Sequence, residues 1–500
     1  MSKEYQDLIK RRHPEYKTLA PHWEFLDSCY RGGRGWFQDN IFRYMKEGDT
    51  EYKDRVARAY RFNHTREVVD LLNKYIFRVK PNRNEEDAPD FVNDFWSGAS
   101  RSGRGIEYLM RHVAKRSSTM GRIYMVIDND YSGGSISIRD EETSESSVYA
   151  YTVNPTDVLD MSYDSRERLN WILIREVSRD DEDPMGGKAD EYYRYRLWTR
   201  ESWFLFEESG ETVVEIDSGD HSLGLVPVIA IDHMEDDSLY SAPALIGDVA
   251  YLDRSVANYL SDLDAIIQDQ TFSQLTIPAQ AFMPGDEQKA AEKLVEMGTK
   301  RIFVYNAEGG ASPSFIAPDP RQAKLIITAV QQLVNEIYHT VGMAGERTKQ
   351  DNSAGIDNSS GVAKAYDFER VNALLTNKAA TLQRAEHEML QIVAAWNGYS
   401  LTEEELASYV VYPENFDARG LIDEFDVSAR LQLVSAPDEI RRKQMELVVK
   451  KLFPGASRKD LDAMMGDIES WPPEMDLPSF SKSESEDSDS EASEIPEVEE

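Results

Sequence analysis

Acidic side chains are the residues of this sequence most able to do chemistry, but their spacing does not favour a catalytic centre. The densest group is the run of four carboxylates at 180–183. A two-metal nuclease takes its carboxylates from several rigid elements and holds two ions about 4 Å apart. Consecutive residues on one segment do not converge in that way. The run therefore indicates a solvated loop, and a magnesium-dependent nuclease is a rival interpretation that a cleavage assay would test.

A second acidic group has the opening pattern of a calcium-binding loop. Asp128, Asp130, Ser132 and Gly133 match the first half of such a loop, but its twelfth position holds Arg139. That position normally supplies a bidentate glutamate, which an arginine cannot replace. The flanking residues also alternate as strands do. The segment is therefore predicted to be a β-hairpin turn and not a metal site.

The remaining catalytic patterns are incomplete. His387 lies between Glu386 and Glu388, but no second histidine follows at helical spacing, so a solvated helix face is expected there. The fragment 186–189 has neither the upstream glycine nor the hydroxyl residue of a phosphate-binding loop. The sequence also contains no GxSxG or HExxH motif. We expect no enzymatic activity, no cofactor and no metal.

The charge balance restricts the function further. The 500 residues carry a net charge of −35, and residues 481–500 hold nine acids against one lysine, Lys482. Such a segment cannot bury enough apolar surface to fold, so 471–500 is predicted to be a disordered acidic tail. The rest is also acidic, which argues against tight nucleic-acid binding by general charge. A single cysteine, Cys29, and the lack of long apolar runs favour folding in a reducing cytosol, with no membrane span.

The elements that would position these residues change character along the chain. Up to residue 120 the pattern is mainly helical, with helices expected at 64–79 and 105–119. From 121 it alternates, and turn residues separate short apolar runs, which predicts an antiparallel β-subdomain. Its expected strands are 121–127, 135–139, 148–153, 170–176, 191–198, 202–206, 212–216 and 227–231.

Long helices dominate the second half. Apolar residues recur at steps of three and four over 243–270 and 320–341, and a helix at 360–397 follows Ser359 and Ser360 as N-caps. Between the first two lies a small insert, and after the third comes a short mixed region. Their expected elements are strands at 274–278, 301–305, 314–317 and 409–412, and helices at 286–297, 436–452 and 458–467. The fold class is therefore α+β.

Three acids of the first long helix are spaced by multiples of seven: Asp248, Asp262 and Asp269. Such spacing drifts by only about 20° per heptad, so the three would lie near one stripe. One interpretation is an ordinary solvated face. The other is an acidic stripe facing a channel, which would keep DNA from adhering to the wall.

Five segments follow one another in a distinctive order: 60–70 (YRFNHTREVVD), 75–78 (YIFR), 359–366 (SSGVAKAY), 383–386 (QRAE) and 412–416 (YPENF). In this order they resemble the bacteriophage portal, or head–tail connector, family. The segment 60–70 (YRFNHTREVVD) with 75–78 (YIFR) resembles the portal stretch before the wing. The segment 359–366 (SSGVAKAY) resembles the start of the helix after the tunnel loop, 383–386 (QRAE) a recurring piece of that helix, and 412–416 (YPENF) the strand after it. The resemblance covers about residues 20–470.

The resemblance implies a portal-type fold: a wing of helices and antiparallel strands, a two-helix stem, a small α/β clip, a long wing helix and a helical crown. Its expected parts are the N-terminal wing at 1–242, stem helix 1 at 243–270, the clip at 271–319, stem helix 2 at 320–342, the tunnel loop at 343–358, the long wing helix and strand at 359–430, and the crown at 431–470.

The function implied is a dodecameric ring at one capsid vertex, the channel for packaging and ejecting double-stranded DNA. Implied partners are other copies of the chain, the DNA, the terminase large subunit, the major capsid and scaffolding proteins, and head-completion or tail adaptor proteins, in the virion and, during assembly, in the host cytoplasm. The loop residues expected to face DNA are Arg347, Lys349, Gln350 and Asn352. Those of the clip expected to face terminase or adaptors are Glu287, Lys289, Glu292, Lys293 and Glu296. A non-ring head-interior or scaffolding protein is the alternative.

Overall fold

The structure is a computed structural model, and it describes residues 2–45, 47–129, 148–179, 185, 191–209, 212–271, 274–278, 302–305, 314–316, 320–343, 361–414, 416, 427, 431, 437–452 and 458–469. The chain divides into two compact units, Met1–Asp417 and Ala418–Glu500. Helices and antiparallel sheets combine in the first unit, so the expected α+β class is confirmed.

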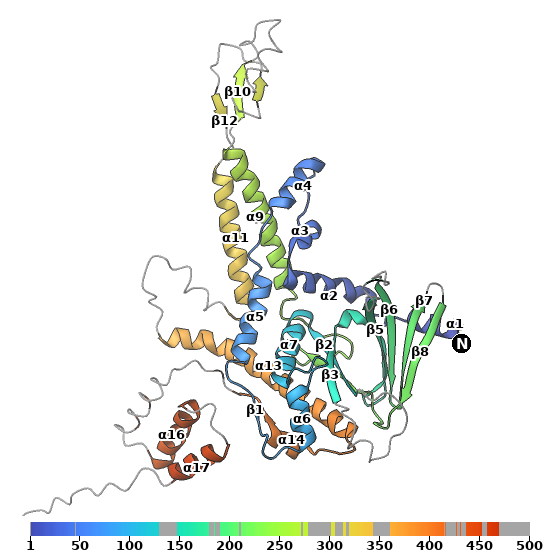
Figure 1. Ribbon diagram of the computed structural model, residues 1–500. Helices are drawn as coiled ribbons and strands as arrows, with labels where there is room; N and C mark the ends of the chain where they lie inside the picture. Colours follow the sequence, from blue (N-terminus) through green and yellow to red (C-terminus); the bar gives the residue numbers. More distant parts are fainter. Residues whose placement is uncertain are drawn as a thin grey trace, which may run out of the picture. The chain divides into compact units, whose positions relative to one another are not determined.

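In the part of the chain that the structure describes, helices α1 to α7 precede the first long strand (Figure 1). Their ends follow local sequence signals: α2 stops at Gly32, whose φ is 63°, and the side chain of Asn63 caps α5 by accepting a hydrogen bond from the Arg66 amide. The helices are α1 (Ser2–Ile9), α2 (Tyr16–Arg31), α3 (Arg34–Asn40), α4 (Asp49–Arg58), α5 (His64–Ile76), α6 (Asp90–Gly98) and α7 (Ile106–Met120).

Two antiparallel sheets follow, and buried side chains from both form one shared cluster. The first sheet has the order β3-β2-β9, and the second is a five-stranded meander, β4-β5-β6-β7-β8. The strands are β2 (Arg122–Asn129), β3 (Val148–Val153), β4 (Val158–Tyr163), β5 (Leu169–Arg179), β6 (Glu191–Thr199), β7 (Ser202–Ser209), β8 (Thr212–Asp220) and β9 (Val228–Asp232). β2 is buried along most of its length because helices and strands cover both of its faces.

Gly121 marks the turn from α7 into β2 and has a φ of 86°. A Cβ atom at this position would lie 1.9 Å from the carbonyl oxygen of Ala242. The Gly121 carbonyl also accepts a hydrogen bond from the His233 amide, and the Leu245 amide donates to the Ser118 carbonyl. The segment that enters the next helix is therefore laid directly against the end of α7.

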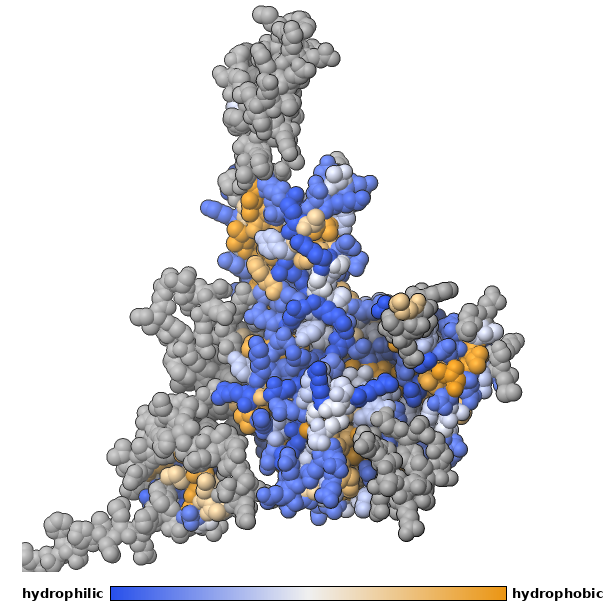
Figure 2. Space-filling model, viewed as in Figure 1, coloured by the Kyte–Doolittle hydropathy of each residue, from blue (hydrophilic) through white to orange (hydrophobic). Residues whose placement is uncertain are grey.

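Two long helices, α9 (Val249–Thr271) and α11 (Pro320–Thr340), pack against each other in opposite directions (Figure 1). Between them in the chain lie β10 (Gln274–Pro278), β11 (Ile302–Tyr305) and β12 (Ser314–Ile316), which form a sheet of order β11-β10-β12 with one parallel and one antiparallel pairing. Hydrophobic side chains gather on the visible surface of the helix pair (Figure 2). Two exposed apolar residues of α11 are Leu325 and Ile327.

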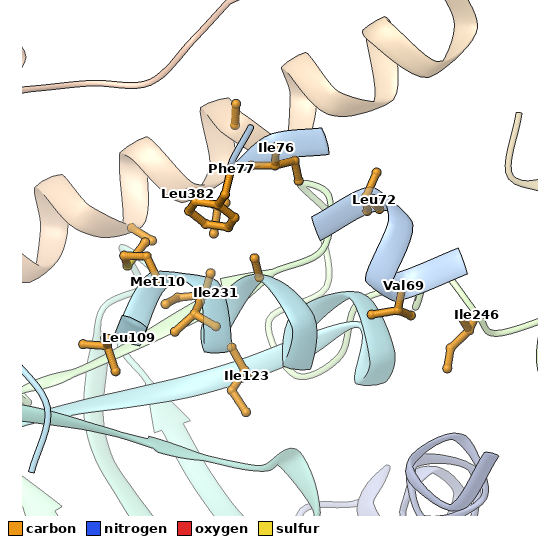
Figure 3. Close-up of a cluster of buried hydrophobic side chains, with 14 of the residues drawn as sticks. Val69, Leu72, Ile76, Phe77, Leu109, Met110, Ile123, Ile231, Ile246 and Leu382 are labelled. Atoms are coloured by element: carbon orange, nitrogen blue, oxygen red, sulfur yellow. The ribbon is translucent and has the colours of Figure 1, made fainter. Parts of the chain in front are cut away.

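The longest helix, α13 (Gly361–Trp396), packs on α5, α6, β2 and β9. It is followed by α14 (Glu403–Tyr409) and β13 (Val410–Val411), and β13 pairs with β1 (Asn82–Arg83). Helices and strands that are distant in sequence share one buried apolar cluster here. Figure 3 shows members of it from α5, α7, β2, β9 and α13: Val69, Leu72, Ile76, Leu109, Met110, Ile123, Ile231 and Leu382. In the second unit, α16 (Asp438–Leu452) packs on α17 (Arg458–Glu469).

Some expected boundaries were wrong. α9 begins at Val249 and not at 243, since Pro243 and Gly247 fall in a segment that ends in a turn at 245–248. The strand β4 and the helix α14 were not expected. The expected strand at 135–139 and the helix at 286–297 lie outside the described residues. Of the hairpin turn expected at 128–134, Asp128 and Asn129 belong to strand β2, and 130–134 lie outside the described residues. β2 and β3 do pair as antiparallel neighbours, with Asn129 opposite Val148.

Candidate functional site: the helix pair and its anchors

A buried carboxylate fixes α9 to α5. Asp253 is fully buried on α9, and its Oδ2 accepts a hydrogen bond from Thr65 Oγ1 at 2.9 Å. The guanidinium of Arg61 lies 3.5 Å from the same oxygen. A buried charge needs such partners because the protein interior solvates it poorly. The contact therefore sets the position of α9 on the helical core.

A second anchor holds α4 and the segment before it against the middle of α9. Arg55 donates from Nη1 to Ser261 Oγ at 3.0 Å, and from Nε and Nη2 to the two carboxylate oxygens of Glu47 at 2.8 and 2.7 Å. The same guanidinium lies 4.0 Å from the centre of the Tyr44 ring. Arg55 and Glu47 are both nearly buried. The planar guanidinium of Arg55 fixes the positions of Glu47 and Tyr44, so this arginine acts as a rigid clamp.

This clamp also binds Asp262, one of the acids predicted to face a channel. Tyr44 Oη donates to Asp262 Oδ1 at 2.5 Å, and burial together with this bond raises the pKa of Tyr44 above its ordinary value. Two residues further along α9, Asp264 lies 3.3 Å from Arg58 of α4. Asp262 and Asp264 are therefore both engaged with the N-terminal part of the chain.

The structure describes the side chains of two of the three acids in the predicted stripe. Asp248 is exposed but precedes the first residue of α9, and its carbonyl accepts the amides of Tyr251 and Leu252. Asp262 is half-buried and bound to Tyr44. The side chain of Asp269 lies outside the described residues. The structure thus places Asp248 before the helix and pairs Asp262 with Tyr44, and the stripe as a whole stays a prediction.

The helix α11 presents a different face, which the sequence reasoning missed. Exposed residues at steps of three and four follow one side of it: Lys324, Thr328, Gln331, Asn335 and His339. Amide and hydroxyl groups occupy the centre of this row. The spacing of polar residues opposite the apolar positions of 320–341 was the signal that could have revealed it. We call this row the amide face of α11.

The C-terminal end of α11 is bound to α5, the same helix that contacts α9 through Thr65. Tyr338 Oη donates to Glu67 Oε2 at 2.5 Å, and it lies 3.2 Å from Nδ1 of the buried His64. His64 and Thr65 are consecutive residues of α5, so one turn of this helix holds both long helices.

An ion pair seals α13 onto the short sheet, and here the expectation of a solvated face around His387 was wrong. Glu386 is fully buried and accepts two hydrogen bonds from Arg83, at 2.7 and 2.9 Å. Tyr412 Oη donates to Glu386 Oε2 at 2.7 Å, and burial raises the pKa of this tyrosine well above its ordinary value. His387 Nε2 lies 3.1 Å from the Val410 carbonyl oxygen. The segment turns inward because β1 and β13 cover it.

A fully buried lysine on α13 has the spacing of a catalytic pair but not its access. Lys378 Nζ donates to Ser117 Oγ at 2.6 Å and to the Asp232 carbonyl at 3.2 Å. Burial lowers the pKa of Lys378 to about 7. A serine activated by a neutral lysine can act as a nucleophile. Both side chains are fully buried, so a substrate cannot reach them and the contact is structural.

Other predicted site residues cannot be placed. Tunnel-loop residues Arg347, Lys349, Gln350 and Asn352 lie outside the described residues. So do the clip residues Glu287, Lys289, Glu292, Lys293 and Glu296. Within the described part of the chain, no group of three or more histidine, cysteine or acidic side chains could hold a metal ion. In the same part, no helix combines the length and apolar character needed to cross a bilayer.

No protein-family model matches this chain, and no curated protein matches it. Solved structures with some likeness come from gene transfer agent (GTA) particles. A chain from the neck of an empty particle, computed with C6 symmetry, has 11% identity and a TM-score of 0.40, over 80% of this chain and 89% of that chain. One from the neck of a native particle, computed with C12 symmetry, has 10% identity and a TM-score of 0.38 over the same shares. One from the virion of a native particle has 10% identity and a TM-score of 0.38, over 86% of this chain and 96% of that chain. At these TM-scores the likeness assigns neither a fold family nor a function to this chain.

Proposed function

We propose that this chain is a portal subunit of a tailed bacteriophage or a phage-like particle. Copies would close into a ring of twelve at one capsid vertex and form the channel through which double-stranded DNA enters and leaves. The observation that carries the proposal is the antiparallel pair α9 and α11, which brackets a small sheet and is followed by the 36-residue helix α13. This is the element order that the motifs at 60–78, 359–366, 383–386 and 412–416 lead one to expect.

The anchors of the helix pair support a wall function. A subunit that lines a channel must keep its long helices fixed while DNA moves past them. Asp253, Arg55 and Tyr338 each join a long helix to the N-terminal helices through buried or half-buried polar contacts. Such networks specify one arrangement of the elements, because any other leaves charges buried without partners.

The surface chemistry of α11 supports weak contact with DNA. In the proposed ring the amide face of α11 lies toward the lumen. Amides and hydroxyls form hydrogen bonds with phosphates but release few counterions, so each contact is weak. Net acidity of the whole chain adds a general repulsion. Weak hydrogen bonds and general electrostatic repulsion would together let a duplex slide along the channel wall without being held.

Electron microscopy of the purified full-length chain tests the proposal. Negative-stain images should show rings with a central hole, and light scattering should give a mass near twelve times 57.0 kDa. A non-ring head-interior or scaffolding protein would give monomers, small oligomers or shells without a central hole at every concentration. That result would refute the portal proposal.

The proposed partners are tested separately. Terminase and adaptor proteins are proposed to dock on the segment 271–319, which holds the charged residues Glu287, Lys289, Glu292, Lys293 and Glu296. Reversing these charges should abolish terminase capture by assembled rings and leave ring formation intact. Loss of rings in the same variant would place these residues in assembly instead.

A further inference from the structure

Two exposed apolar residues of α11 point to nearly opposite sides of the helix. Leu325 is 72% exposed and Ile327 is 44% exposed. Two positions along an α-helix turn by about 200°, so these side chains cannot share one face. The amide face of α11 lies about midway between them, opposite the buried positions of the helix. The helix therefore has an apolar residue on each flank and a polar face between the flanks.

Both flanks continue three turns further along α11. Glu336 follows Leu325 by eleven residues, and Tyr338 follows Ile327 by eleven residues. Eleven residues make about three turns, so each pair shares one side of the helix. Glu336 is exposed, whereas Tyr338 is buried and bound to Glu67 of α5. We call the side of Leu325 and Glu336 the leucine flank.

The other side presents an aromatic ring and a cation where α5 covers Tyr338. Phe62 is 60% exposed, and its ring lies 5.9 Å from that of His64. Arg66 is exposed on the same turn of α5, and it donates from Nε and Nη2 to the carbonyls of Tyr30 and Arg31. A guanidinium has five N–H donors, so Arg66 can also donate to a carboxylate of another molecule. We call this side the α5 flank, and it consists of Ile327, Phe62 and Arg66.

The two flanks are complementary at two matching heights along the axis of α11. Leu325 and Ile327 differ in height by about 3 Å, since each residue rises 1.5 Å. Glu336 and Tyr338 have the same offset, and Arg66 lies on the turn of α5 that binds Tyr338. An apolar residue on one flank thus has an apolar residue at its height on the other flank. About 16 Å away along the helix, an exposed acid on one flank likewise has an exposed cation at its height on the other.

We propose that the leucine flank of one copy of the chain packs on the α5 flank of the next copy. Leu325 contacts Ile327 of the neighbouring copy, and Glu336 pairs with its Arg66. This inference rests on the proposed ring, because an amide face turned to the lumen directs both flanks of α11 at neighbouring copies. The two surfaces differ, so the contact is heterologous, and each copy keeps one unused flank until the ring closes.

The spacing of packed helices agrees with such a ring. Twelve parallel helices with axes about 10 Å apart close at a radius of about 19 Å. Subtracting a helix half-width of about 5 Å leaves a bore roughly 28 Å wide, which admits a DNA duplex. Side-by-side packing of α11 therefore gives a channel of the size that the proposed function needs.

An engineered disulfide in the assembled full-length chain tests the apolar contact. Leu325→Cys together with Ile327→Cys places two thiols on opposite sides of one helix, where they cannot bond within one copy. Cys29 is fully buried and should stay unreactive. Mild oxidation of the double variant should give a ladder of covalent oligomers on a denaturing gel, and a mixture of the two single variants should give dimers. Dimers from one single variant alone would indicate a symmetric contact and would overturn the inference.

Charge reversal tests the polar contact. Glu336→Lys should raise the concentration at which half of the chains assemble about tenfold, as expected for the loss of one charge-assisted contact. Adding Arg66→Glu to this variant should restore assembly. Glu201→Lys is the matched control, because it reverses an exposed acid in the β6–β7 turn, outside both flanks. An equal effect of the control would mean general charge repulsion and would count against the pairing of Glu336 with Arg66.

The outcomes distinguish this contact from the portal proposal itself. Rings in the electron microscope without a disulfide ladder would refute the contact and leave the portal proposal standing. A ladder without rings would support the contact and refute the closed ring. Absence of both would overturn both proposals. The two cysteine positions are exposed, so the ladder decides even if Arg66→Glu fails to fold.

Discussion

Lys378 makes the stability of the first unit depend on pH in a direction that can be worked out. The ordinary pKa of a lysine is 10.5, and burial lowers that of Lys378 to about 7. Between these values the unfolded chain binds a proton that the folded chain does not, so the free energy of unfolding rises with pH across this window. Below about pH 7 both states are protonated, and the cost of burying the charge is fully present. The difference corresponds to an upper bound of about 5 kcal/mol.

Replacing this lysine with methionine should remove that dependence. Methionine keeps most of the side-chain volume, and Ser117 Oγ still donates to the Val113 carbonyl at 2.7 Å, so its hydroxyl is not left unpaired. At pH 7 we expect Lys378→Met to be as stable as the wild type or more so. By pH 10 the wild type should gain several kcal/mol relative to the variant.

Urea denaturation at pH 7, 8, 9 and 10, followed by tryptophan fluorescence, measures this difference. The wild-type minus variant value cancels other groups that titrate in the same range. His233 is also buried. Burial is the larger cause that lowers its pKa well below the ordinary value, and the positive charge of the nearby Lys378 is the smaller cause. Its contribution falls below pH 7 and does not interfere. A wild-type minus variant difference that stays constant from pH 7 to 10 would refute the reasoning.

Three further predictions concern the anchors and the core. Glu386→Gln should destabilise the first unit by about 3–5 kcal/mol because it leaves the Arg83 guanidinium without its buried counter-ion; a loss below 1 kcal/mol in denaturant titrations would contradict this. Tyr44→Phe should cost about 1 kcal/mol and speed proteolysis before α4, since the bond to Asp262 is lost, and an unchanged cleavage rate would count against the clamp. Cys29 is buried, and its sulfur lies 3.3 Å from Trp36 Nε1. Burial also raises the pKa of the thiol, so a thiol reagent should label the wild type only on unfolding. Rapid labelling of the native chain would contradict this.

The sequence predicted elements with strong periodicity better than it predicted their ends or neighbours. The strand at 274–278 and the helix at 360–397 were found because their apolar patterns and caps are local. The start of α9 was misplaced, since Leu245 continues the three-and-four spacing into a turn and is still partly buried against the core. Residues Thr402 and Glu405 carry the capping box of α14, a local signal that could have revealed this helix.

The candidate site was less predictable because its contacts join distant residues. Asp262 reads as a free acid on a helix, but its partner Tyr44 is 218 positions away. Glu386, flanked by polar neighbours, pairs with Arg83 at a separation of 303. Periodicity describes which face a residue shares with its own helix. It does not describe what covers that face. Acids expected to be exposed, such as Asp262 and Glu386, are therefore found bound to residues distant in the sequence.

Gly121, at the end of α7, limits which substitutions this protein can accept during evolution. A methyl group at position 121 would collide with the Ala242 carbonyl and would also require a backbone conformation that side chains rarely adopt. The strand that starts there and the segment that leads into α9 would have to separate. Even the smallest substitution at this position would therefore displace the root of the helix pair, so homologues that retain this architecture should carry no side chain there, however far the rest of their sequences diverge.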